Sequence, residues 1–376
     1  MVFGIIAAAF LVSFIVYYLQ TYTGLQEDVQ RGKILNNFEM ICEDVYLTGN
    51  PVDFNQFSEI KFNLNFDVSE PPGIVSSMGK TPLKVMVLFS PGKRVFIDDG
   101  SLDMKWFKFR YVIAMPRSRV IFVPMKNTEL VWSLIENITE HMPDSTGFKN
   151  RITFGFCSGN VLKENFCGED GKDLCDKKEF LEKIKEKNAP GFFDCKKTVS
   201  NVNGEYRFIK ISTSCTSPSR GLCVTLPDSN GIGRIYINGS KNYLIYKDAL
   251  DIVSAIVGYD YKTIYGIAGE NLYIYKNREF SKKISIAAEM MSNRAILIAS
   301  EIENALRNGE LDSDSMDARC LPLFHRFAML MNQIKSIISD KDYYTSLGTT
   351  ITLKTKLDEI ENLHSKMVIS GCDYEI

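Results

Sequence analysis

The sequence has few histidines and lacks the short motifs by which many hydrolases and metalloenzymes are recognised. Only three histidines occur in 376 residues, namely His141, His325 and His364. Neither H-E-x-x-H nor G-x-S-x-G accompanies them, so the zinc-peptidase and serine-hydrolase patterns are missing. We interpret all three as structural or surface side chains. The sequence therefore assigns no catalytic residue, no cofactor-binding residue and no metal ligand.

The chain also lacks an excess of charge of either sign. Its 44 Lys and Arg residues nearly balance its 46 Asp and Glu residues, which leaves a net charge of −2. A protein that binds nucleic acid shows a basic patch or stripe that neutralises phosphates. We therefore predict no DNA or RNA partner.

No nucleotide-binding or calcium-binding motif is complete. Residues 73–81 approach the P-loop pattern G-x-x-x-x-G-K-[ST], but five residues separate the two glycines and Pro82 leads into a strand pattern. We interpret this segment as an ordinary turn. The acidic segments 98–100 and 312–317 lack the EF-hand pattern, so we interpret them as solvated turns.

The nine cysteines include no C-x-x-C pair, which argues against a structural zinc site. Six of them fall within 67 residues rich in polar side chains. Loops with so little apolar content are stabilised by cross-links. We therefore predict disulfides among these six: Cys157, Cys167, Cys175, Cys195, Cys215 and Cys223.

Three cysteines lie outside that group. Cys320 precedes a predicted helix at 322–338, and Cys372 follows a predicted helix at 352–367. An antiparallel helix pair brings these two positions together, so we predict a Cys320–Cys372 disulfide. For Cys42 we favour a buried thiol over an intermolecular bridge.

A long apolar run is the most informative feature that is present. Residues 2–19 are apolar apart from Ser13, and no charged side chain occurs before Glu27. A helix of this length is about 27 Å long, which matches the hydrocarbon core of a bilayer. We predict an uncleaved membrane anchor that contacts the lipid bilayer through residues 2–19. A cleavable signal peptide is the alternative, but it requires a basic residue before the run and a small-x-small site after it.

Two observations point in opposite directions for the orientation of the body. Arg31 and Lys33 follow the apolar run, which favours a cytoplasmic body by the positive-inside rule. The cysteine pattern favours an oxidising compartment. We weigh the cysteines more heavily and predict a single-pass membrane protein with an extracytoplasmic body.

Hydrophobic periodicity predicts an α+β fold. An N-terminal transmembrane helix (1–24) continues as an amphipathic stalk helix (25–50), on which Ile34, Phe38, Ile41 and Val45 share one face. A β-rich module closed by a helix follows (51–145), then a Cys-rich α+β module (146–280) and a C-terminal helical module (281–376).

Individual elements follow from local signals. Strict alternation predicts a strand at 60–68, and Asn127 is expected to cap a helix over 128–141 with Leu130 facing inward. Two Tyr-rich hairpins are predicted, at 234–246 and 263–275, and a helix over 249–257 is predicted between them. A helix is expected from Ser281 to Gly309, with an apolar core stripe. That stripe comprises Ile284, Ala288, Met291, Ala295 and Ile298.

An apolar N-terminal helix that runs on as an amphipathic one beneath a β-rich, disulfide-bearing body resembles type IV pilin-like surface proteins. The resemblance covers about 50 residues and implies a surface location. Pilins carry Glu where this chain has Ile5, and no basic-Gly leader precedes the run. We therefore expect a stand-alone anchored ectodomain rather than a filament subunit.

The leading functional hypothesis is a non-catalytic surface protein with a structural or binding role, which would engage a protein partner or associate with itself. Two alternatives stay open. One is a membrane-tethered, hydrolase-like enzyme, which requires a pocket where titratable residues converge. The other is a cytoplasmic-facing membrane adaptor, which reduced cysteines would favour.

Overall fold

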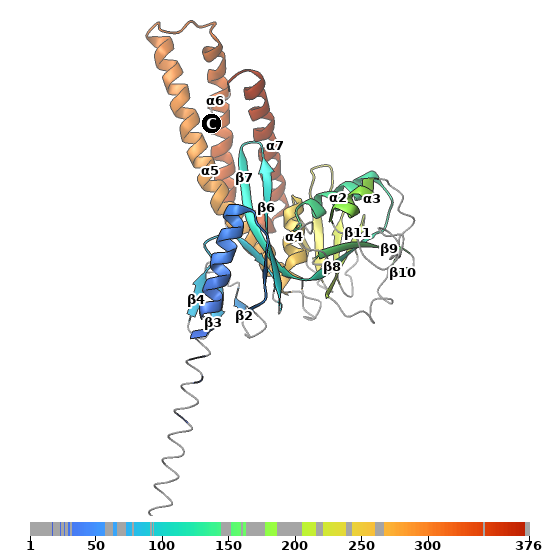
Figure 1. Ribbon diagram of the computed structural model, residues 1–376. Coiled ribbons are helices and arrows are strands. Elements are labelled where there is room, and N and C mark those ends of the chain that lie inside the picture. Colours follow the sequence, from blue (N-terminus) through green and yellow to red (C-terminus); the bar gives the residue numbers. More distant parts are fainter. Residues whose placement is uncertain are drawn as a thin grey trace, which may run out of the picture.

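The structure is a computed structural model with an α+β architecture (Figure 1). It describes only part of the chain. The described residues are Tyr17, Thr23, Gln26, 29–30, 32–56, 63–65, 73–76, 79–90, Gly92, 94–143, 152–158, 161–162, 177–185, 205–215, 221–237, 243–259, 267–340 and 343–372.

Residues 32–48 form a helix, called here the N-terminal helix, as the amphipathic pattern predicts. Its apolar face, with Phe38 and Val45 fully buried, packs against a four-stranded sheet. The predicted anchor at 2–19 lies outside the described residues except for Tyr17. Of the helices that are described, none has the length and apolar content needed to span a membrane.

The four-stranded sheet has the order β1-β6-β7-β5. Its strands are β1 (Val52–Phe54), β5 (Val87–Phe89), β6 (Val95–Met104) and β7 (Phe107–Pro116). β6 and β7 pair as a long antiparallel hairpin, and β5 pairs in parallel with β7. One face of this sheet covers the N-terminal helix, while its other face joins the main core.

A separate three-stranded antiparallel sheet contains β2 (Asn63–Asn65), β3 (Gly73–Ser76) and β4 (Gly79–Pro82). The predicted strand at 60–68 is therefore confirmed over its centre, and its remaining residues lie outside the described part. The P-loop-like segment forms the β3-β4 strand pair. A phosphate loop requires a strand followed by a helix, so this geometry does not match a P-loop.

The seven-stranded sheet has the order β10-β9-β8-β11-β12-β13-β14. Its centre is parallel, because β8 (Ser118–Pro124) pairs in parallel with β9 (Ile152–Ser158) and β11 (Glu205–Ser212). β12 (Leu222–Thr225) also pairs in parallel with β11. The edges are antiparallel and comprise β10 (Val161–Leu162), β13 (Gly233–Ile237) and β14 (Tyr243–Tyr246).

Helices α2 (Glu129–Glu140) and α3 (Lys177–Lys185) pack on the β9 side of this sheet. The α2 start differs from prediction in two details. Thr128, not Asn127, is the N-cap residue, and Asn127 instead accepts a 2.7 Å hydrogen bond from the Trp132 indole. Leu130 is exposed, because the buried face begins at Val131.

The predicted hairpin at 234–246 is confirmed by the antiparallel pairing of β13 with β14. The second predicted hairpin, at 263–275, is wrong. Those of its residues that are described belong to helix α5 (Ile267–Arg307), which begins well before the predicted start at Ser281. Tyr273, Lys276, Asn277 and Phe280 share a buried helical face, and their spacing of three and four residues explains the difference.

The C-terminal region is a set of antiparallel helices. α5 has 41 residues and is about 60 Å long. It packs along α6 (Met316–Ile338), and α6 packs along α7 (Leu347–Ile369). Gly309 ends α5 with a φ of 74°, as predicted. α6 begins six residues before Pro322, so Cys320 lies inside the helix rather than before it.

One predicted module boundary, 280/281, falls within helix α5, which crosses it without a break. The 145/146 boundary lies outside the described residues, but β8 before it and β9 after it are neighbours in one sheet. The modules predicted from local sequence patterns therefore share one sheet and one helix.

Candidate functional site: a buried polar cluster

Helix α4 (Ala249–Gly258) occupies the centre of the molecule, where it contacts α2, α5, β5 and β14. The predicted helix at 249–257 is confirmed. Every residue of α4 except Ala249 is buried, and Asp251 is the charged residue among them. Such a helix carries partial charges at its ends that require polar partners within the core.

The two ends of α4 have partners of opposite charge. At the N-terminus, the Asp248 side chain caps the helix by accepting a 2.8 Å hydrogen bond from the Asp251 backbone N–H. At the C-terminus, the fully buried Arg207 guanidinium donates to the carbonyls of Ile256 and Val257. A carboxylate at the positive end and a cation at the negative end both stabilise the helix dipole.

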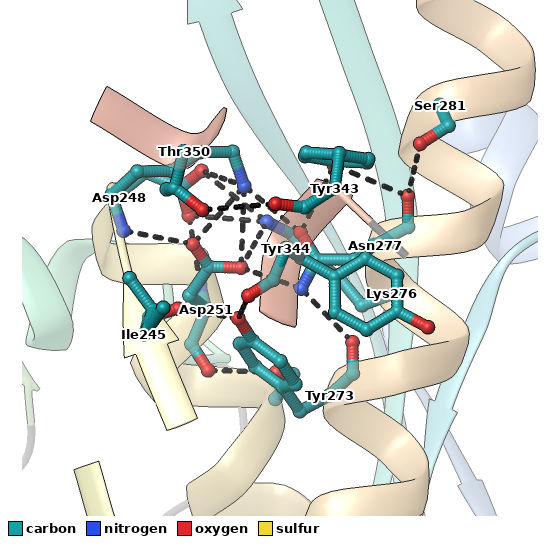
Figure 2. A network of polar contacts seen from close by, with 12 residues as sticks. Ile245, Asp248, Asp251, Tyr273, Lys276, Asn277, Ser281, Tyr343, Tyr344 and Thr350 are labelled. Carbon is teal, nitrogen blue, oxygen red and sulfur yellow. Dashed lines mark hydrogen bonds and ion pairs between the residues drawn. The ribbon is translucent and has the colours of Figure 1, made fainter. Parts of the chain in front are cut away.

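A buried polar cluster surrounds the N-terminus of α4 (Figure 2). It is defined here as Lys247, Asp248, Asp251, Lys276, Asn277 and Tyr343. Lys247 and the two aspartates come from the β14–α4 junction. Lys276 and Asn277 come from α5, and Tyr343 comes from the short 3-10 helix η4 (Tyr343–Thr345) before α7. Three segments far apart in the chain therefore meet here.

Two lysines and two aspartates balance the charge of the cluster. The Lys276 ammonium lies 2.8 Å from Asp251 Oδ1 and 3.2 Å from Asp248 Oδ1. The Lys247 ammonium lies 3.1 Å from Asp251 Oδ2 and 3.3 Å from Asp248 Oδ2. Removal of each ion from water costs several kcal/mol, so a buried charge is tolerated only when it is paired in this way.

The shifted pKa values reflect this competition between burial and pairing. Burial would raise the pKa of Asp248, but the Lys247 and Lys276 ammonium groups outweigh it and hold that pKa below its ordinary value. Burial lowers the pKa of Lys276, despite the opposing effect of both aspartates. Burial also acts to lower the pKa of Lys247, but there Asp248 and Asp251 prevail and the pKa is raised.

Asn277 joins the charged groups to the tyrosines. Its Nδ2 donates to Asp251 Oδ1 at 3.0 Å and to the Tyr273 carbonyl at 3.1 Å. Its Oδ1 accepts from Lys247 Nζ at 2.9 Å and from the Tyr343 hydroxyl at 3.3 Å. All four contacts match donors to acceptors, so the amide orientation is determined by its surroundings.

Most of the cluster is closed to solvent. Asp251, Lys276, Asn277 and Tyr343 have no exposed surface, Lys247 is only 6 % exposed, and the Asp248 side chain is 16 % exposed. The Phe280 ring lies over both ammonium groups, at 5.0 Å from Lys247 Nζ and 5.1 Å from Lys276 Nζ. The arrangement therefore joins α4, α5 and η4 and leaves Asp248 as its point of contact with water.

A second polar contact lies beside the cluster. The buried Tyr111 hydroxyl donates to the His141 carbonyl at 3.2 Å and lies 3.3 Å from His141 Nδ1. Burial lowers the pKa of His141. His325 instead pairs with Glu303 between α6 and α5 at the surface, which fits the predicted structural or surface role.

The structure places four of the eight predicted disulfide cysteines in bonds. Cys320 pairs with Cys372, as predicted, and Cys215 pairs with Cys223. Cys157 lies on β9, but its side chain is not among those described. Cys167, Cys175 and Cys195 lie outside the described residues. Cys42 is a free, fully buried thiol, in agreement with the prediction.

The acidic segments are not assembled into a metal site. Asp98 and Asp99 lie within strand β6 rather than in a turn, where Asp99 forms an ion pair with Arg110. In the part of the chain that the structure covers, no three His, Cys, Asp or Glu side chains are grouped to hold a metal ion.

The polar cluster was not among the features predicted from the sequence. A signal was present, because Lys276 and Asn277 interrupt an otherwise apolar helical face between Tyr273 and Phe280. The strand assignment of 272–275 concealed it, since the two-residue period places these side chains on alternating faces. Searches against protein-family models, curated proteins and solved structures found no match to this chain.

Proposed function

We propose that this protein is a non-catalytic, single-pass membrane protein with an extracytoplasmic body. A long helical arm extends from that body. The helical arm is defined as residues 286–307 of α5 together with α6. The observation that carries the proposal is that one continuous helix, α5, belongs both to the body and to the arm. Figure 1 shows this part of α5 and α6 extending beyond the sheets.

The surface of the helical arm supports a binding role. Ile286, Met290 and Leu297 are 61 %, 68 % and 62 % exposed. Their spacing of four and seven residues aligns them along one face of α5. Aligned exposed apolar side chains are typical of contact surfaces for other proteins. This supports a partner protein or self-association at the arm.

The position of the arm fits an anchored protein. The C-terminal end of the N-terminal helix contacts the base of α5, where the Lys283 ammonium lies 5.5 Å from the Tyr46 ring. Figure 1 shows the N-terminal helix, in blue, on the side of the molecule away from the α5–α6 tip. An anchor before residue 32 would therefore leave the arm directed away from the bilayer. The disulfides at Cys215–Cys223 and Cys320–Cys372 support an oxidising compartment.

Anchoring is tested by carbonate extraction of membranes that contain the full chain. We expect the protein to stay in the membrane pellet, and a Leu11→Arg/Ile15→Arg variant to be released, because two charges at the centre of a span oppose insertion. The matched control is Leu47→Arg, at an exposed position in the last turn of the N-terminal helix. Release of the unmodified protein by carbonate would contradict the anchor.

The orientation is tested with a Met290→Cys variant and a membrane-impermeant maleimide. Met290 is exposed on the arm, whereas Cys42 is buried and burial raises its pKa, so Cys42 is unreactive. We expect intact cells to label the variant above the level of the unmodified protein. Labelling that appears only after lysis would contradict the extracytoplasmic body and favour the cytoplasmic adaptor.

A further inference from the structure

The buried polar cluster places an amine, a carboxamide and a carboxyl group in mutual contact. Lys247 Nζ lies 2.9 Å from Asn277 Oδ1, the oxygen bonded to the Asn277 Cγ carbon. Asp251 contacts both groups, with Oδ2 at 3.1 Å from Lys247 Nζ and Oδ1 at 3.0 Å from Asn277 Nδ2. A nucleophile, an electrophile and a proton carrier are thus within hydrogen-bond reach of one another, which is the proximity from which acyl transfer can begin.

The surroundings favour attack on Asn277. Its carbonyl oxygen accepts from the Tyr343 hydroxyl, so negative charge developing on that oxygen during attack by Lys247 would be stabilised. Asn277 and Asp251 have no exposed surface, and the Phe280 ring covers the lysine. Exclusion of water protects the acyl carbon from hydrolysis and strengthens each polar contact.

We propose that Lys247 and Asn277 become joined by an intramolecular amide bond. The Lys247 ammonium transfers a proton to Asp251, and the neutral amine attacks Asn277 Cγ to form a new C–N bond. Asp251 then delivers that proton to Nδ2, the Cγ–Nδ2 bond breaks, and ammonia leaves. The former lysine nitrogen gives its surplus proton to the Asp251 carboxylate, which ends the step protonated. The amine and the carboxamide are thereby converted to a substituted amide and ammonia, with no oxidant, reductant or co-reactant. The inference does not depend on the proposed function.

The geometry assigns the bond to Lys247 rather than to Lys276. Lys276 neighbours Asn277 on the same helix, and its ammonium contacts Asp248 and Asp251 rather than the Asn277 amide. Its positive charge lies against the same carboxylate that receives the proton of Lys247. Lys247 reaches Asn277 from a different segment, so only its bond would join α5 covalently to the β14–α4 junction.

Mass spectrometry of the purified, reduced full chain tests the proposal. We expect a digest to contain a branched peptide in which Lys247 and Asn277 are linked, with a mass lower by one ammonia than the sum of the two peptides. The branched peptide decides the test, because Asn-Gly pairs such as Asn308–Gly309 also lose ammonia on ageing. Unlinked Lys247 and Asn277 peptides in the folded protein would overturn the proposal. A branched peptide with the loss of water would place the bond on an aspartate and would also overturn it.

Variants separate the chemistry from the fold. Asp251→Asn keeps both reacting groups but removes the proton carrier, and Lys247→Arg keeps the positive charge but removes the amine. We expect neither variant to yield the branched peptide. Lys354→Arg, at a surface ion pair on α7, is the matched control and should retain it. Circular dichroism shows which variants fold, and a folded Asp251→Asn protein that still forms the bond would overturn the role of Asp251.

Discussion

Among single residues, a few buried charges contribute to the packing of the core together with its apolar side chains. Lys276 and Asp251 are fully buried in contact with each other, and Arg207 is fully buried at the end of α4. Loss of one partner from such a pair leaves an uncompensated charge in the core, which costs about 3–5 kcal/mol. These charges therefore favour the packing of α4 against α5 in which each charge keeps its partner.

The contribution of His141 to stability can be tested in the physiological pH range. Burial lowers its pKa below 6.5, with Lys276 acting in the same direction and Asp248 and Glu140 acting against it. The unfolded chain therefore binds a proton at a higher pH than the folded protein does. The stability due to neutral His141 is complete above its unfolded pKa and is lost as the pH falls through its folded pKa.

We expect the free energy of unfolding to fall between about pH 7 and about pH 5, and His141→Gln to reduce that fall by up to about 1 kcal/mol per pH unit. Urea denaturation at several pH values measures this. His325→Gln, on the exposed side of α6, is the control for the replacement of a histidine. Equal pH slopes for the wild-type protein and His141→Gln would show that His141 does not contribute.

At the scale of the element, α5 shows how tertiary contacts extend a helix beyond its local signals. The residues from Ser281 onward carry a helical apolar stripe, and three of its five members are fully buried: Ile284, Ala288 and Ala295. The preceding turns contain Tyr273 and Tyr275, aromatic residues that favour strands in isolation. Burial of these tyrosines and the pairing of Lys276 with Asp251 of α4 stabilise the same segment as a helix.

Two glycines at helix ends, Gly309 and Gly348, predict opposite effects of the same substitution. Gly309 ends α5 with a φ of 74°, and no atom lies within 4 Å of an added Cβ, so Gly309→Ala introduces backbone strain alone. We expect it to destabilise the protein by about 1 kcal/mol. Gly348, in the first turn of α7, also has open space but no positive φ. Gly348→Ala should stabilise by about 0.4–1 kcal/mol through the entropy of the unfolded chain.

Thermal and urea unfolding of the two single variants measure this difference. The two substitutions add the same methyl group in open surroundings, so side-chain packing is matched and only the backbone conformation differs. Destabilisation by both variants, or by neither, would contradict the assignment of a left-handed cap at Gly309.

At the scale of the whole molecule, covalent cross-links and non-local sheets hold the elements together. The Cys320–Cys372 bond joins the first turns of α6 to the end of α7 across 52 residues, whereas Cys215–Cys223 spans only 8. The chain-entropy relation gives about 4 kcal/mol for the longer loop and about 2.5 kcal/mol for the shorter one. The longer bond is therefore expected to contribute more to the stability of the molecule.

Double substitutions test this expectation. We expect Cys320→Ala/Cys372→Ala to lower the free energy of unfolding by about 1.5 kcal/mol more than Cys215→Ala/Cys223→Ala does. Urea denaturation under oxidising conditions measures both. Because both variants remove a pair of sulfur atoms, each serves as the control for the other. An equal or reversed order would mean that the loop lengths do not determine the two contributions.

Features that depend on near neighbours along the chain could be predicted from the sequence alone. The amphipathic face of the N-terminal helix, the β13-β14 hairpin, helix α4 and the glycine stop of α5 all follow from periodicity and turn chemistry over a few residues. The Cys320–Cys372 bond also followed, because two adjacent antiparallel helices bring their ends together.

Contacts between segments far apart in the chain could be identified only from the tertiary structure. The pairing of β8 with β11, the start of α5 at Ile267 and the convergence of Lys247, Asp251 and Asn277 have no local signature. Strand order depends on contacts between residues far apart in sequence, and a buried lysine is tolerated only where a carboxylate from another segment reaches it. A local pattern contains neither kind of information, so the polar cluster became visible only in three dimensions.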